Sequence, residues 1–180
     1  MYFGYDSGVA VEARHVISVL VENRPGVLAR VAGMFSGRAF NIQSLAVAPT
    51  LDESYSRMTI VTHGDEHIIE QIIKQLRKLI NVVKVQDLTS GDYVEREMIL
   101  VRTKATDTKR EEVLRITDIF RGKVVDVTPD TITVEVTGSQ GKIEAILELL
   151  APIGIVDLIR AGTLAIPRGK KTPKSTGSHE

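Results

Sequence analysis

The chain has 180 residues, of which 43% are apolar, and it carries 23 basic and 23 acidic side chains. This balance argues against nucleic acid as an obligatory partner, because phosphate contacts need a basic face. The absence of cysteine excludes disulfides, thiolate metal ligands and a cysteine nucleophile.

Residues 1–14 are expected to form an N-terminal extension. They lack the basic region and apolar stretch of a signal peptide. No apolar run in the chain approaches the ~20 residues that span a bilayer. We therefore expect a cytoplasmic protein with no membrane partner.

Residues 15–89 alternate between the periodicities of strands and helices. The expected elements are a strand at 15–22, a helix at 27–37, strands at 41–48 and 55–62, a helix capped by Asp65 that reaches Leu79, and a strand at 82–88. Their order is βαββαβ.

The same order returns at 95–167, after a linker at 90–94 that contains Ser90, Gly91 and Asp92. Its expected elements are a strand at 98–103, a helix at 109–121, hairpin strands at 123–127 and 131–137, a helix at 139–150 and a strand-rich end at 155–166. The prediction is an α+β fold of two tandem ferredoxin-like units. Residues 168–180 are expected to form a disordered tail.

A turn between the first strand and the first helix has the features of a small-ligand site. It begins at Asn23, and Pro25 and Gly26 favour a tight turn that leads into the helix. The backbone N–H groups from Gly26 through Val27 to Leu28 then lie at a helix N-terminus, which attracts a carboxylate. The alternative is a plain connecting turn in which Asn23 caps the helix.

The second strand of this unit is expected to be a sheet edge that pairs with another copy of the chain. The ferredoxin-like strand order 4-1-3-2 places it at the border, and residues 42–48 carry no charge. Unpaired edges are normally protected by lysine, proline or bulges, and a two-fold homodimer is the most common way to pair one.

Asn41 and Ile42 begin this strand at the end of the sheet opposite to Gly26, because an ~11-residue helix about 16 Å long lies between them. One chain therefore cannot place both on the same small ligand. An antiparallel two-fold pairing would bring the partner's Asn41 toward Gly26, so the pocket should form only in the dimer.

Residues 16–88 resemble an ACT domain, a module whose side-by-side dimers bind amino acids. The resemblance lies in Asn23-x-Pro25-Gly26-Val27-Leu28 and in Asn41-Ile42. It implies that the backbone of Gly26, Val27 and Leu28 holds a carboxylate, while Asn23 and the partner's Asn41 hold polar groups. Val27, Leu28 and Ile42 would then surround an apolar side chain.

Residues 15–169 are similar to the small regulatory subunits of acetolactate synthase. The matching segments are 41–49, 56–61, 75–79, 95–97, 119–122 and 125–129. The resemblance implies a chain without catalytic residues, metal site or cofactor of its own. It would bind and activate a catalytic large subunit, to which thiamine diphosphate, Mg and FAD belong, and confer feedback inhibition by a branched-chain amino acid, usually valine.

Three other functions are open at this stage. An RNA-recognition domain needs aromatic residues on its central strands, and an acylphosphatase-type enzyme needs a phosphate loop, for which Arg24 is the lone arginine. An ACT-type amino-acid sensor that acts on a different partner is the third.

A few polar residues are not explained by the expected site. Glu95 and Glu97, on either side of Arg96, are interpreted as a solvated entry to a strand, with docking to a partner as the alternative. His15 is expected to face water. His63 and His67 lack a third ligand and do not predict a metal site.

Overall fold

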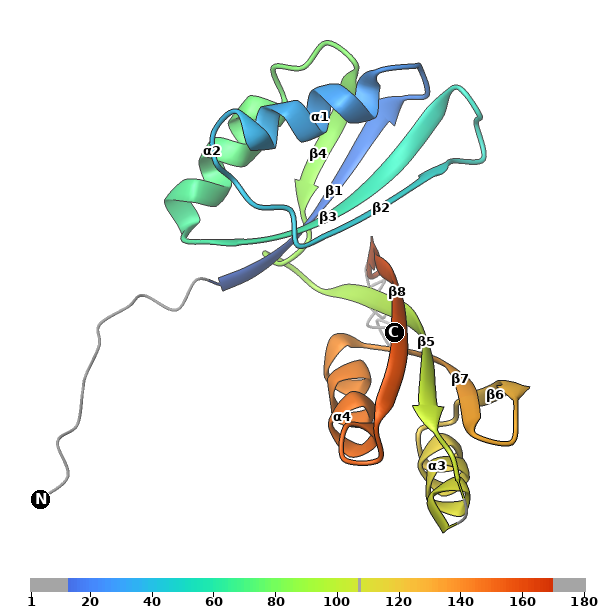
Figure 1. Ribbon diagram of the computed structural model, residues 1–180. Coiled ribbons are helices and arrows are strands. Elements are labelled where there is room, and N and C mark those ends of the chain that lie inside the picture. The colour runs from blue at the N-terminus through green and yellow to red at the C-terminus, as the bar shows by residue number, and fades with distance from the viewer. Residues whose placement is uncertain (1–12, 107, 170–180) are drawn as a thin grey trace, which may run out of the picture.

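The computed structural model describes residues 13–106 and 108–169, which form two α+β units in succession (Figure 1). The expected extension at 1–14, apart from its last two residues, lies outside the described residues, and so does the expected tail from residue 170 onward. Within the described part of the chain, no helix is both long and apolar enough to cross a membrane.

The first unit has the predicted order βαββαβ. Its elements are β1 (Ala13–Glu22), α1 (Val27–Ser36), β2 (Ser44–Pro49), β3 (Tyr55–Gly64), α2 (Glu66–Leu76) and β4 (Val82–Asp87). The antiparallel sheet has the order β2-β3-β1-β4, so β2 is an edge strand, as predicted. The predicted cap of α2 is also confirmed, because the Asp65 carboxylate accepts a hydrogen bond from the Ile68 amide at 2.8 Å.

The second unit repeats this arrangement. Its elements are β5 (Tyr93–Lys104), α3 (Thr108–Ile119), β6 (Lys123–Val127), β7 (Thr131–Gly138), α4 (Gln140–Leu150) and β8 (Ile155–Pro167). The sheet order is β6-β7-β5-β8, which matches the first unit strand for strand. The α+β fold with two tandem ferredoxin-like units is thus confirmed.

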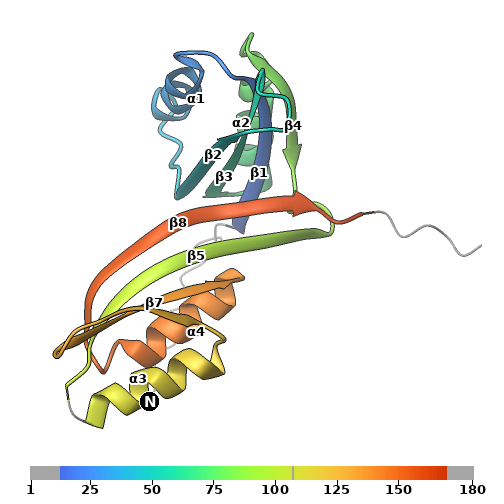
Figure 2. The ribbon, with the colours of Figure 1, turned by 90° about the vertical axis from the view of Figure 1, so that its right-hand side faces the viewer.

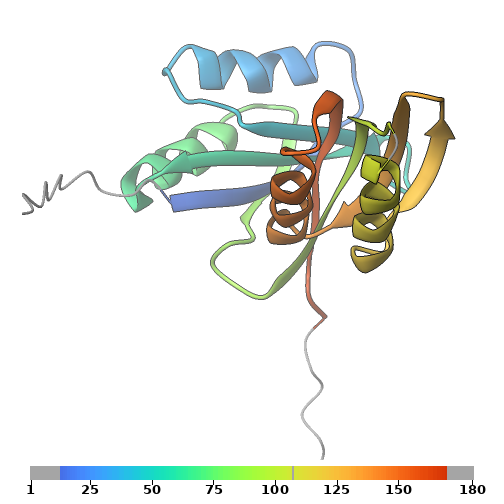
Figure 3. The ribbon, with the colours of Figure 1, turned by 60° about the horizontal axis from the view of Figure 1, so that its bottom comes forward.

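Each unit has its own apolar core between its sheet and its two helices. In the first, alternate residues of β1 and β3, such as Ile17, Val19 and Ile60, pack against Phe35 of α1 and Ile72 of α2. In the second, α3 and α4 lie side by side on the face turned away from the first unit (Figures 2 and 3). Both cores leave one face of their sheet free of helices.

The two units meet through the long strands β5 and β8. These strands cross the helix-free face of the first sheet (Figure 2), and β8 contacts β2, β3 and β1. β5 begins at Tyr93, inside the stretch predicted as a linker at 90–94. The second unit therefore begins earlier than predicted, because β5 and β8 pair along almost their whole length, from Tyr93 with Pro167 to Thr103 with Ile155.

Candidate functional site

The turn before α1 presents two backbone N–H groups that have no hydrogen-bond partner among the described residues. Gly26 occupies the N-cap position of α1 in the left-handed region, with φ +83°, and no side chain caps the helix. Among the described residues, nothing accepts a hydrogen bond from the amides of Leu28 and Ala29. A Cβ at Gly26 would meet no atom within 4 Å, so the space beside Gly26 is open. The first turn of α1 can therefore accept an anion such as a carboxylate.

Asn23 fixes this turn to the loop between β2 and β3. Its backbone amide donates to the Ser54 carbonyl at 2.8 Å, and its side-chain Nδ2 donates to the Glu53 carbonyl at 2.9 Å. The amide nitrogen of Asn23 is thus used inside the protein, while the residue is exposed and its Oδ1 accepts no hydrogen bond from the described residues. An acceptor oxygen at this position suits an ammonium group.

The other residues predicted for this half of the site differ in exposure. Pro25 and Leu28 are exposed, the Leu28 side chain by 45%. Val27 is 5% exposed and belongs to the core. Val27 thus offers its backbone to a ligand, whereas Leu28 offers both its backbone and an apolar side chain.

Asn41 and Ile42 lie at the opposite end of the sheet, as predicted. The strand register aligns Ser44 with Val61 and Val16 at one end, and Pro49 with Ser56 and Val21 near the other. At about 3.3 Å per residue, Asn41 and Gly26 are separated by on the order of 20 Å along the strands. Asn41 is exposed, while Ile42 is half-buried and packs on the first core. The two predicted halves do not meet within one chain.

The outer side of β2 has no strand paired to it among the described residues. Residues Val47, Ala48 and Pro49 are exposed, and the strand carries no charged side chain. A bare edge of this kind favours pairing with another strand.

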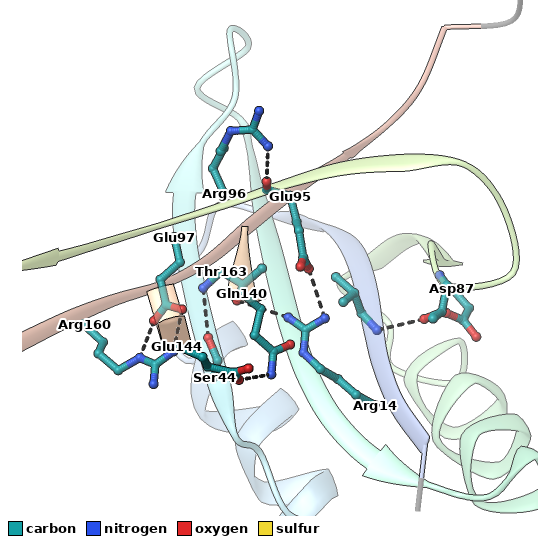
Figure 4. Close-up of polar contacts among 12 residues, drawn as sticks. Arg14, Ser44, Asp87, Glu95, Arg96, Glu97, Gln140, Glu144, Arg160 and Thr163 are labelled. Carbon is teal, nitrogen blue, oxygen red and sulfur yellow. Dashed lines mark hydrogen bonds and ion pairs between the residues drawn. The ribbon is translucent and has the colours of Figure 1, made fainter. Parts of the chain in front are cut away.

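A cluster of charged residues between the two units was not predicted (Figure 4). The interpretation of Glu95 and Glu97 as a solvated strand entry is wrong. Glu97 is 7% exposed and pairs with Arg160, while Glu95 pairs with Arg14 at 3.0 Å. One signal was present in the sequence, because Glu97 shares the strand parity of the buried Ile99.

His15 is also placed differently from the expectation that it faces water. Its Nδ1 lies 3.2 Å from Oδ2 of Asp87 on β4, and its side chain is only 14% exposed. The pairing depends on β1 and β4 being neighbours in the sheet, which a single sequence position does not reveal.

Comparisons with known proteins agree over both units. The family model described as AHAS small subunit-like ACT domain matches residues 17–84, and the model described as small subunit of acetolactate synthase matches residues 96–169. The acetolactate synthase small subunit of Aquifex aeolicus is 51% identical over 156 residues, which cover 86% of this chain and 81% of that protein. The chain belongs to the family of acetolactate synthase small subunits.

Two further relatives support this family and its fold. The acetolactate synthase isozyme 3 small subunit of Escherichia coli is 49% identical over 88% of this chain and 98% of its own. The crystal structure of the acetolactate synthase small subunit from Thermotoga maritima superposes with a TM-score of 0.80 at 38% identity, and the match covers 88% of this chain and 99% of that one. Membership in the small-subunit family supports a regulatory role rather than a catalytic one.

The helix-free face of the first sheet is where an RNA-recognition domain would stack bases. In this small subunit, Val16, Ser18, Thr59 and Val61 on that face are all buried, and Val16 and Val61 pack with Ala165 of β8. The face therefore offers no aromatic platform to a nucleic acid.

Proposed function

We propose that this chain regulates acetolactate synthase by binding a branched-chain amino acid between two copies of itself. In this proposal the dimer binds the catalytic large subunit, raises its activity, and makes it sensitive to feedback inhibition by valine or a related amino acid. Thiamine diphosphate, Mg and FAD remain with the catalytic subunit, and this chain contributes no cofactor.

The observation that carries the proposal is the division of the site between opposite ends of one sheet. Among the described residues, the unpaired amides of Leu28 and Ala29 lie at one end, and Asn41 lies at the other, three residues before an edge strand without charges. A two-fold axis near the middle of β2 would pair the edge strand with its copy in antiparallel fashion. The partner's Asn41 would then lie next to the open space at Gly26, and each dimer would have two equivalent sites.

Each part of an α-amino acid has a matching group in this arrangement. The carboxylate would accept hydrogen bonds from the first turn of α1, where the helix dipole also favours a negative charge. The ammonium group would donate to Oδ1 of Asn23 and to the partner's Asn41. The exposed side chain of Leu28 and the partner's Ile42 would contact the apolar side chain. Valine is one methylene smaller than leucine and isoleucine, a difference that changes binding by about 1–3 kcal/mol.

The proposal is tested by calorimetric titration of the full chain with valine, leucine and isoleucine, in the wild type and in Asn41→Ala. At least one amino acid should bind to the wild type at one site per chain, and Asn41→Ala should weaken it about tenfold or more. Asn81→Ala is a matched control, because Asn81 lies in the same unit and its side chain bonds to Glu22 and Arg30. Binding that is unchanged in Asn41→Ala would contradict the site.

The link to the enzyme is tested separately with the reconstituted holoenzyme. Adding this chain to the catalytic subunit should raise acetolactate formation, and the amino acid that binds in calorimetry should lower it again. An amino acid that binds without affecting the catalytic subunit would instead support a sensor with a different partner.

A further inference from the structure

The joint between the two units has an apolar side and a polar side. On the apolar side, Val16, Val61 and Leu88 of the first unit pack with Ala165 of β8, and Tyr93 packs against them. This small, fully buried cluster holds the units together without directional bonds. Such a contact permits a small rotation of one unit against the other.

On the polar side, the edge strand β2 contacts β8 directly. The hydroxyl of Ser44 accepts a hydrogen bond from the backbone amide of Thr163 at 3.0 Å (Figure 4). Next to it, Gly162 has φ +82°, and a Cβ there would lie 3.1 Å from Ser44 Oγ and 3.3 Å from the Leu45 carbonyl oxygen. Only glycine therefore allows β8 to approach β2 this closely.

The contact coincides with an irregularity in β8. Glu97 pairs with Thr163, while Ile99, two residues on, pairs with Arg160, so β8 has one extra residue at Ala161–Gly162. A bulge bends its strand and increases the local twist. Directly after the bulge, the amide of Thr163 donates to Ser44 while Thr163 stays aligned with Glu97 of β5. The bulge thus lies where β8 also bonds to the first unit.

A cavity of about 350 Å³ adjoins this contact. Its lining includes Ser44, Gly162 and the charged residues Arg14, Glu97, Glu144 and Arg160. A space of this size between the units leaves room for the polar side of the joint to close or open while the apolar side stays packed.

We infer that Ser44, Thr163 and Gly162 form a latch through which the effector site sets the orientation of the second unit. This inference rests on the proposed function. Ser44 follows Asn41 by three residues at the same end of β2, so an amino acid held by Asn41 acts on the strand that carries the latch. A shift of β2 by a few tenths of an ångström changes the hydrogen bond between Ser44 and Thr163. The second unit then turns about the apolar cluster.

Two sites linked in this way must influence each other reciprocally. Loss of the latch should leave the amino-acid site nearly intact, because Ser44 does not belong to it. Loss of the latch should, however, weaken the inhibition of the holoenzyme by the amino acid, because that inhibition depends on the orientation of the second unit.

Ser44→Ala tests the latch, with Ser36→Ala as its control. Ser36 is exposed at the end of α1, and its hydroxyl forms no hydrogen bond among the described residues. In Ser44→Ala without ligand, the amide hydrogen of Thr163 should exchange about two- to tenfold faster than in the wild type. Amino-acid affinity should change less than twofold, while the inhibition of the reconstituted holoenzyme at saturating amino acid should fall. Ser36→Ala should behave as the wild type does.

The failure of the latch and the failure of the proposed function have different signatures. Full inhibition in Ser44→Ala would overturn the latch and leave the proposed function standing. Equal exchange of the Thr163 amide in Ser44→Ala and the wild type would also overturn it. A wild type that binds none of the three amino acids would contradict the proposed function, and with it the signal through the latch.

Discussion

Glu97 and Arg160 form a two-point ion pair between the neighbouring strands β5 and β8. Nε of Arg160 lies 2.6 Å from Oε1 of Glu97, and one terminal nitrogen lies 2.7 Å from Oε2. The Glu97 side chain is 7% exposed and that of Arg160 is 44% exposed. Hydrogen bonding to Glu97 raises the pKa of Arg160 further above its usual value, so its guanidinium stays charged near neutral pH.

Glu97→Gln should lower the free energy of unfolding by about 2 kcal/mol, because it removes the charge that compensates Arg160 and leaves a buried amide with poorer hydrogen bonds. Water at the half-exposed Arg160 limits the loss. Urea denaturation followed by circular dichroism measures the change. Glu148→Gln, an exposed position on α4, should shift stability by less than about 0.5 kcal/mol. Equal shifts in both variants would contradict a stabilising ion pair.

The order of the elements and the edge position of β2 were predictable because they depend on local patterns. Alternation of apolar residues indicated β7, and Asp65 marked the start of α2. The edge position of β2 followed from the antiparallel order that these elements adopt. These features need no knowledge of distant contacts.

The charged cluster between the units was not predictable in the same way. Arg14 and Glu95 are 81 residues apart, and Glu97 and Arg160 are 63 apart. Glu97 and Arg160 meet because β5 and β8 are neighbours in the second sheet, whereas Arg14 and Glu95 meet because β5 crosses the first sheet. No local pattern encodes either arrangement. In the sequence alone, where these ion pairs cannot be seen, Glu95 and Glu97 resemble ordinary solvated charges. The bulge at Gly162 was not predictable either, because it depends on how β8 pairs with the distant strand β5.

The conformation of Gly26 leads to a prediction with a matched control in the same helix. Gly26→Ala should destabilise the chain by about 1 kcal/mol, because a residue with a Cβ disfavours φ +83° even where no atom lies nearby. Gly33→Ala lies inside α1 with open space around it and without positive φ, so it should stabilise by about 0.5–1 kcal/mol. Thermal or chemical denaturation of the two variants shows whether each substitution raises or lowers the free energy of unfolding. A stabilising Gly26→Ala would contradict the strained turn.

The edge of β2 leads to a prediction about the oligomeric state. Val47→Lys introduces a charge on this strand, where the side chain is 42% exposed, and two copies of it would lie close to the proposed two-fold axis. It should convert the dimer to a monomer in analytical ultracentrifugation while the circular dichroism spectrum stays the same. Val83→Lys is the matched control, because Val83 is 55% exposed on β4 at the opposite edge of the sheet. A dimer that survives Val47→Lys but not Val83→Lys would place the interface at the β4 edge and contradict pairing through β2.

A site divided between two chains should be rescued by mixing two defective chains. Leu28→Glu places a carboxylate beside the unpaired amides of α1, where it favours the helix but repels a ligand carboxylate. Asn41→Ala removes the side chain that the second chain would contribute to the site. Each variant alone should bind the amino acid at least about tenfold more weakly than the wild type in calorimetry. A refolded equal mixture should recover wild-type affinity at about a quarter of its sites, because each mixed dimer has one intact site. No recovery in a mixture that ultracentrifugation shows to be dimeric would mean that each chain forms its own site.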